Sequence, residues 1–147
     1  MRRLTILVAL LILAMAIGSK DVIGMELSQF QWKNRLLFLF ASDNKDMDFI
    51  ALKKEIDSQK PGVEDRDLII FEVLEQGQSL MNSKPLDRLM VDSIRKRFDV
   101  AKDRYTLILV GKDGGIKLRR NETVRLSDIF GLIDSMPMRQ QEIRLKK

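Results

Sequence analysis

Four basic residues that lie close together in the sequence are the side chains most suggestive of a binding surface. They are Lys112, Lys117, Arg119 and Arg120, and they surround the turn sequence Asp113-Gly114-Gly115. On a strand after that turn, Lys117 and Arg119 point to the same side, because side chains alternate along a strand. Ammonium and guanidinium groups bind anionic groups and acidic protein surfaces. The alternative is that these charges protect the edge of a sheet from aggregation.

Residues suited to catalysis are scarce in this chain. It has no cysteine and no histidine, which removes thiol nucleophiles, the most common metal ligand and the most common general base. Ser42 needs a base to take its proton, and here a lysine would have to serve. The acidic cluster of Asp43, Asp46 and Asp48 lacks the glycine and the distal glutamate of a calcium loop, and the helix dipole, which stabilises acids in a first turn, explains it better. We therefore expect binding rather than catalysis, without cofactor or metal.

The first eighteen residues are typical of an exported protein. Met1-Arg2-Arg3 precedes the uncharged apolar run Leu4–Ile17, and small residues follow, as in a secretory signal peptide. We expect cleavage near residue 18 and a periplasmic or secreted protein. The run is shorter than the roughly 20 residues that span a bilayer. We expect membrane contact only if the segment stays attached.

The rest of the chain is mildly basic, with 24 Lys and Arg residues against 21 Asp and Glu residues. Both signs are scattered along the chain, which is not the pattern of a nucleic-acid-binding surface. Without cysteines the domain has to be stabilised by its core alone, and its length allows this. A protein partner is compatible with this composition, whereas the oligomeric state cannot be inferred from it.

The first half of the domain predicts a βαβ unit. Two nearly continuous apolar runs, Arg35–Ala41 and Asp67–Glu75, are typical of strands covered on both faces. Between them, Ser42-Asp43-Asn44 provides N-capping residues for a helix, and Pro61-Gly62 provides its end.

The second half predicts a helix, a hairpin and a last helix. Pro85 opens the first helix, whose buried stripe includes Leu89. The hairpin is Tyr105–Arg120, with Asp113-Gly114 in a type I′ turn and Ile116 and Leu118 facing the core. Ser127 caps the last helix and Pro137 ends it.

These elements give a three-layer α/β sandwich in the order β-α-β, α, β-β, α, with a mixed four-stranded sheet. We place the signal peptide at residues 1–18, a connector at 19–34, the domain at 35–137 and a charged, fraying tail at 138–147. In the connector, the only tryptophan, Trp32, is expected to cover one end of the core.

The order of elements resembles the thioredoxin fold, and three segments resemble domain-of-unknown-function family 4174. The segments are Leu27–Ala41 (LSQFQWKNRLLFLFA), Gly111–Arg119 (GKDGGIKLR) and Asp134–Glu142 (DSMPMRQQE). This family comprises small exported bacterial proteins and domains of vertebrate extracellular sushi-repeat and coiled-coil-containing matrix proteins. It is regarded as thioredoxin-like and peroxiredoxin-related, without an established activity.

The resemblance to thioredoxins also implies a missing redox site. Thioredoxins carry Cys-x-x-Cys just after the first core strand, where this chain has Ser42 and Asp43. The proline that precedes their third core strand is replaced near Tyr105-Thr106. The resemblance therefore implies a non-catalytic binding or interaction module. The alternative is a peroxiredoxin-related redox accessory or a degenerate oxidoreductase.

Overall fold

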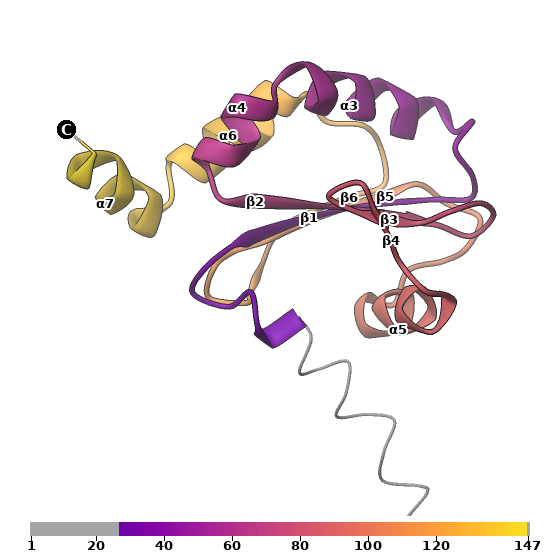
Figure 1. Cartoon of the computed structure of the whole chain (residues 1–147). Coiled ribbons are helices and arrows are strands. Elements are labelled where there is room, and N and C mark those ends of the chain that lie inside the picture. Colours follow the sequence, from indigo (N-terminus) through magenta and orange to yellow (C-terminus); the bar gives the residue numbers. More distant parts are fainter. Residues whose placement is uncertain (1–26, 147) are drawn as a thin grey trace, which may run out of the picture.

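A six-stranded mixed sheet separates two helical layers in the computed structural model, which describes residues 27–146 (Figure 1). Its order is β4-β3-β2-β1-β5-β6. In the centre, β1 (Arg35–Ala41) pairs in parallel with β2 (Leu68–Leu74) and antiparallel with β5 (Thr106–Val110). The outer strand β6 (Ile116–Arg120) pairs with β5. These four strands follow the expected order, and β1 and β5 are buried along their whole length.

Two short strands correct the four-stranded prediction. A hairpin of β3 (Leu80–Met81) and β4 (Lys84–Pro85) extends the sheet beyond β2. Its turn residues, Asn82 and Ser83, both have positive φ, at 46° and 67°, as a type I′ turn requires. Pro85 therefore lies in an edge strand, which tolerates a missing N–H, and not in a helix. Two-residue strands are too short to show alternation in a sequence.

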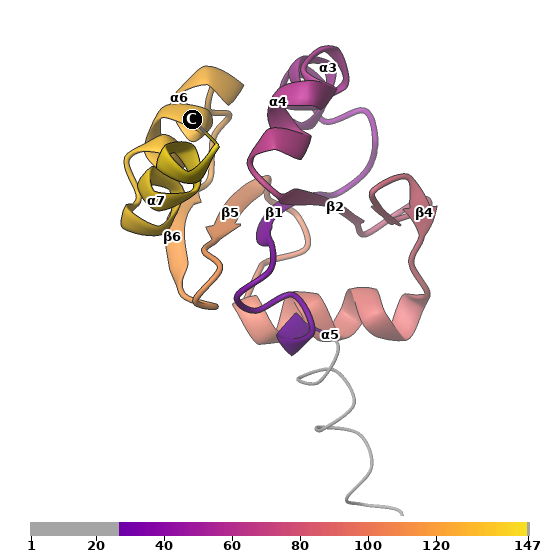
Figure 2. The same cartoon turned by 60° about the vertical axis from the view of Figure 1, so that its left-hand side comes forward.

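The helices form one layer on each face of the sheet (Figures 1 and 2). On one face lie α3, α4 and α6, and on the other lies α5. The last helix, α7, follows α6 on the side of the molecule where β1 begins. Their bounds are α3 Met47–Ser58, α4 Lys60–Asp65, α5 Arg88–Phe98, α6 Leu126–Asp134 and α7 Pro137–Leu145.

Alternation along β1 divides the core into two halves. Leu37 and Leu39 pack with the layer of α3, α4 and α6. Phe38 and Phe40 point to the α5 side. The Phe38 ring centroid lies 4.5 Å from that of Phe71 and 4.8 Å from that of Phe98. This aromatic group buries the apolar surface that a domain without disulfides needs.

Several expected helix boundaries were wrong. Asp46, and not residues 42–44, caps α3, where its side chain accepts a hydrogen bond from the Phe49 N–H. Asp87 caps α5 in the same way, accepting from the Met90 N–H. Leu89, which was expected in the buried stripe of this helix, is 79% exposed. The N-cap position of α6 is Arg125 and not Ser127.

Both prolines expected to end helices lie instead in the first turn of the next one. Pro61 does so in α4 and Pro137 in α7. The first turn tolerates proline, because its N–H groups have no partner inside the helix. The segment expected to be a fraying tail is therefore largely helical.

The β5–β6 turn differs from the expected type I′ turn. Only Gly114 has positive φ, at 83°, so the two-residue turn is replaced by a longer loop that the Gly111 N–H closes on the Gly115 carbonyl. A bulge follows, in which Val110 pairs with Ile116 but Leu109 pairs with Leu118. As a result Ile116 is half exposed, contrary to expectation, while Leu118 packs against the core.

The expected signal peptide, residues 1–18, lies outside the described residues, as does the first half of the connector, residues 19–26. Trp32, which was expected to cover the core, is 63% exposed, and its backbone N–H donates to the Lys112 carbonyl at 2.6 Å. Between residues 27 and 146, no helix has the length and apolar character needed to cross a membrane.

Candidate functional site

Ser42 and Asp43 lie at the carboxyl end of β1, at the position expected for a missing redox site, and both make local contacts. The Ser42 hydroxyl donates to the Lys102 carbonyl at 3.1 Å. The Asp43 carboxylate accepts the Lys45 N–H at 2.8 Å. A serine whose proton is directed at a carbonyl has no base to activate it as a nucleophile.

Three cations surround one carboxylate beside Ser42. Glu75, which follows β2, lies 3.1 Å from Arg88, 3.3 Å from Lys102 and 3.6 Å from Arg95. Burial alone would raise the pKa of Glu75, but the hydrogen bonds from Lys102 and Arg88 outweigh it and hold the pKa below its ordinary value. We call these residues, together with Ser42, the carboxyl-end cluster.

Arg95 is the structural centre of the carboxyl-end cluster. It is 4% exposed and its Nη2 donates to the carbonyls of Ala41, at 2.9 Å, and Val73, at 3.1 Å. The guanidinium thus ties α5 to the ends of β1 and β2. A surface hollow of about 360 Å³ beside it is lined by Arg88, Arg95, Lys96 and Lys102, with Asp92 and Asp99. The charged groups at this end serve mainly to join α5 to the sheet.

The structure does not gather the four basic residues of the predicted binding surface into one surface. Arg119 donates to the carbonyls of Phe98 and Asp99, on the α5 side of the sheet, and Arg120 donates to the Arg119 carbonyl. Lys112 and Lys117 instead line a common pocket near α7. The bulge in β6 interrupts the simple alternation on which the expected common direction of Lys117 and Arg119 was based.

Lys112 belongs to an ion-pair network at the amino end of β1. It is 8% exposed, and its Nζ lies 2.7 Å from Asp67 and 2.7 Å from Glu142. Arg35, which is 1% exposed, makes a two-pronged contact with the Glu142 carboxylate at 3.1 and 3.2 Å. Burial would raise the pKa of Glu142, but hydrogen bonds from Arg35 and Lys112 hold it below its ordinary value.

Arg139 extends this network through α7. It is 3% exposed and contacts the carboxylates of Asp65, Asp134 and Glu142. Hydrogen bonds from Lys146 and Arg139 lower the pKa of Asp65 to about 2. We call Arg35, Asp65, Asp67, Lys112, Asp134, Arg139 and Glu142 the amino-end network.

Sequence reasoning missed Arg35, Arg139 and Glu142 as a group. The sequence predicts Arg35 only as the first residue of a strand, and it predicts Glu142 to lie in a fraying tail. A usable signal was present, because all three lie in the segments that carry the family resemblance. The network brings these segments into contact, because Gly111–Arg119 and Asp134–Glu142 meet at the start of β1.

A pocket of about 480 Å³ opens between the β5–β6 turn and the start of α7. Its charged walls are Arg35, Lys112, Lys117 and Asp113, and its apolar walls include Leu132, Met136 and Met138. Lys117 Nζ lies 2.7 Å from Asp113, and this hydrogen bond lowers the pKa of the Asp113 carboxyl. We call this cavity the hairpin–α7 pocket.

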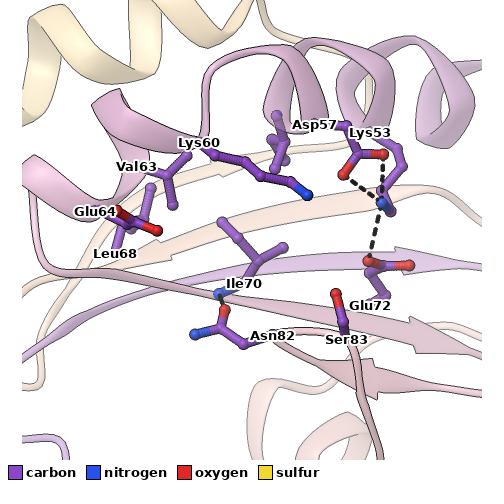
Figure 3. A pocket seen from close by; sticks show the side chains of 11 residues that line it. Lys53, Asp57, Lys60, Val63, Glu64, Leu68, Ile70, Glu72, Asn82 and Ser83 are labelled. Atoms are coloured by element: carbon purple, nitrogen blue, oxygen red, sulfur yellow. Dashed lines mark hydrogen bonds and ion pairs between the residues drawn. The ribbon is translucent and has the colours of Figure 1, made fainter.

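A second pocket, of about 260 Å³, lies between α3, α4 and β2 and contains a buried acid (Figure 3). Glu72 is 8% exposed, and burial raises its pKa although Lys53 lies 3.6 Å away. Carboxyls of this kind serve as general acids in some enzymes. Lys53 also contacts Asp57 at 2.6 Å, so its charge is shared between two carboxylates. The sequence signal was an acid inside the apolar strand LIIFEVL.

Among residues 27–146, no three Asp or Glu side chains are grouped in a way that could hold a metal ion. The arrangement offers fixed charges around two hollows, one at each end of β1, and around the pocket that contains Glu72.

Two curated relatives match most of this chain. Coiled-coil domain-containing protein 80 of Danio rerio is 25% identical over 137 residues, and sushi repeat-containing protein SRPX2 of Xenopus laevis is 22% identical over 123 residues. Each match covers 82% of this chain, but only 16% of the first relative and 27% of the second.

Solved structures with the same fold are peroxiredoxins. A reduced 2-Cys peroxiredoxin of Plasmodium vivax superposes with a TM-score of 0.59 at 15% identity, over 78% of this chain and 84% of its own. Plasmodium yoelii Prx1a gives a TM-score of 0.58 at 16% identity, over 78% and 80%. The likeness establishes a thioredoxin-like fold, and the identity is too low to establish more.

The family model described as domain of unknown function, DUF4174, matches residues 26–142, a range that includes both ends of β1 and all of the amino-end network. The chain therefore belongs to the DUF4174 family, and it has a thioredoxin-like fold without cysteine.

Proposed function

We propose that this protein is a non-catalytic binding module that acts outside the cytoplasm. The observation that carries the proposal is the state of the carboxyl end of β1, where thioredoxins place their dithiol. There the Ser42 hydroxyl is bonded to a backbone carbonyl, and Arg95 is bonded to two strand carbonyls. Since the chain contains no thiol and no imidazole, these groups support the fold and are not positioned for redox or acid–base chemistry.

Export is supported by the first eighteen residues and by the relatives. Residues 4–17 carry no charge and follow Arg2 and Arg3, as in a secretory signal peptide. Relatives that contain sushi repeats or coiled coils place the domain within much longer chains. The lack of cysteine and histidine in this chain fits a small module that binds a partner better than one that turns over a substrate.

The proposal is tested by assays of peroxide consumption and of disulfide reduction on the purified chain, with the Ser42→Ala variant alongside. We expect no turnover above that of buffer for either protein. Turnover that decreases in Ser42→Ala would contradict the proposal and favour the alternative, a redox accessory or degenerate oxidoreductase. A mass measurement of protein recovered from cells tests export, because the expected mature chain begins near residue 18.

A further inference from the structure

We propose that the hairpin–α7 pocket binds a small organic anion, in which one carboxylate or phosphate group is joined to an apolar body. This assignment rests on the proposed function, since it names the ligand class of a binding module. The pocket has a volume of about 480 Å³, within the usual range for small-molecule sites. Its walls are divided between charged and apolar groups, which determines the kind of ligand that fits.

The charged wall is built from buried cations with donors to spare. Lys112 has three ammonium protons, and its contacts to Asp67 and Glu142 use two of them. Arg35 binds Glu142 through both Nη atoms, while its Nε has no hydrogen-bond partner in the structure. A polar atom buried without a partner is costly, and a ligand oxygen or a water that it recruits would satisfy it.

The start of α7 adds a second, independent attraction for an anion. Met136, Pro137 and Met138 line the pocket, so the helix N-terminus opens into it. No side chain of the described residues caps this end. The first N–H groups of a helix have no partner within the helix, and they carry the positive end of its dipole. Anions are bound at such ends in many proteins.

The acids near the pocket are each paired with a cation, so they do not cancel the attraction of the pocket for an anion. Asp113 is the only acid on the wall and is paired with Lys117, while three cations line the same wall. Glu142 and Asp67 bind Lys112, and Arg139 in turn binds Glu142 together with Asp65 and Asp134. Two further cations, Arg66 on Asp134 and Lys146 on Asp65, offset the remaining acids.

The apolar wall indicates that the ligand is more than a bare inorganic ion. Leu132, Met136 and Met138 line the same pocket as the cations, and methionine adapts to ligands of different shape. A headgroup held by Lys117 and the start of α7 would leave its apolar body against these side chains.

The hollow in the carboxyl-end cluster is a weaker candidate, although it is also lined mainly by cations. Its wall runs along α5 from Arg88, the first residue of the helix, to Asp99 and Val100, which follow its last turn. The carbonyl end of a helix carries the negative end of the dipole and repels anions. Glu75, moreover, already contacts three of the four cations on this wall, Arg88, Arg95 and Lys102.

The test uses the full chain labelled with ¹³C at the methionine methyl groups, with Met136 and Met138 assigned through their leucine variants. The probes are octanoate, octyl phosphate, octanol and inorganic phosphate, all below micelle-forming concentrations. We expect octanoate or octyl phosphate, or both, to shift the two methyl signals saturably. We expect octanol and inorganic phosphate to bind at least about tenfold more weakly, because each lacks one of the two groups that the walls recognise.

Lys117→Gln and Lys53→Gln form a matched pair of variants. Each lysine contacts an aspartate four residues away, at 2.7 Å from Asp113 and 2.6 Å from Asp57, and their side chains are 34% and 28% exposed. We expect Lys117→Gln to weaken binding about tenfold, as the loss of a charge-assisted hydrogen bond does, and Lys53→Gln to leave it within about twofold.

Met138→Glu separates binding from folding. A carboxylate in the first turn of α7 is favourable for the helix, yet it occupies the position of the ligand's charge. We expect a stable protein that no longer binds either anion.

Equal binding of octanol, equal effects of the two lysine variants, or no saturable shift with any probe would each overturn the assignment. If no probe shifts the methyl signals and no redox turnover is found, only the ligand assignment to the hairpin–α7 pocket is wrong. Redox turnover, in contrast, would contradict the proposed function.

Discussion

The two ends of β1 carry similar charge but use it differently. The hollow at each end is lined by two more cations than acids. At the carboxyl end, Arg95 Nη2 donates to two strand carbonyls, and its Nε, which also has no hydrogen-bond partner, lies 3.6 Å from the Glu75 carboxylate. The negative end of α5 lies beside this hollow. At the amino end, the positive end of α7 opens into the pocket and Arg35 Nε has no partner.

This difference shows that net charge alone does not identify a binding site. A cation whose donors are all occupied gains little from a ligand, because ligand binding would break an existing contact. Lys112 keeps one ammonium proton beyond its contacts to Asp67 and Glu142. The backbone also contributes charge through the ends of helices, and this contribution has opposite sign at the two ends of β1.

The largest expected effect is on stability at the carboxyl end. Arg95→Ala removes a buried side chain and leaves the carbonyls of Ala41 and Val73 without its hydrogen bonds. We expect a loss of about 2–4 kcal/mol in the free energy of unfolding, measured with denaturant. Arg97→Ala, an exposed arginine on the same helix, should cost less than about 0.5 kcal/mol. Equal effects would mean that Arg95 does not hold α5 to the sheet.

At the amino end, Arg139→Ala is expected to release α7 without unfolding the domain. Arg139 joins α7 to Asp65 and Asp134, and few apolar contacts would replace it, since it is the buried residue of this helix. We expect a local loss of about 1–3 kcal/mol, seen as faster amide exchange over residues 138–145 while β1 and β5 stay protected. Uniformly faster exchange would show that α7 is instead part of the cooperative core.

Acid should weaken the amino-end network in a defined pH range. Asp65 has a pKa of about 2 in the fold against an ordinary value of 3.8, so its stabilising contribution is present above pH 4 and is lost as the pH falls towards 2. The lowered pKa values of Glu75 and Glu142 act in the same direction.

Glu72 acts in the opposite direction, because burial raises its pKa and its protonation as the pH falls therefore relieves a cost. We therefore expect a melting temperature that stays level or rises slightly from pH 7 to 5 and falls below pH 4. In Asp65→Asn the fall should be shallower. A steady decline that begins at pH 6 would contradict this account.

The central part of the fold could be predicted from the sequence, whereas its boundaries could not. Continuous apolar runs identified β1, β2 and β5, because strands buried on both faces leave no polar alternation. The β3–β4 hairpin was missed, since its strands are two residues long. Pro61 and Pro137 were taken as helix ends, because a proline in the first turn of one helix looks the same as a stop for the previous one.

The candidate site was predictable only in part. The sequence correctly placed Ser42 after the first core strand and drew attention to Lys112 and Lys117. It could not show that Lys112 is buried between Asp67 and Glu142, because these acids are 45 and 30 positions away and meet it only in the fold. A bulge, which has no reliable signal in a single sequence, interrupts β6 at Lys117. As a result Lys117 contacts Asp113, whereas Arg119 contacts the Phe98 carbonyl.

The smallest expected effect returns to the carboxyl end. Ser42→Ala removes one partly exposed hydrogen bond to the Lys102 carbonyl. We expect a cost below about 1 kcal/mol in the free energy of unfolding and no change in anion binding. Loss of anion binding in this variant would place the binding site at the carboxyl end of β1 and contradict the assignment to the hairpin–α7 pocket.

A map of backbone amide chemical shifts during titration with octyl phosphate tests the central claim most directly, because it reports on both ends of β1 at once. We predict changes centred on residues 111–118 and 135–142, which form the hairpin–α7 pocket and the start of α7. Changes centred instead on Ser42, Glu75 and the residues of α5 would contradict the claim that ligand binding belongs to the amino end.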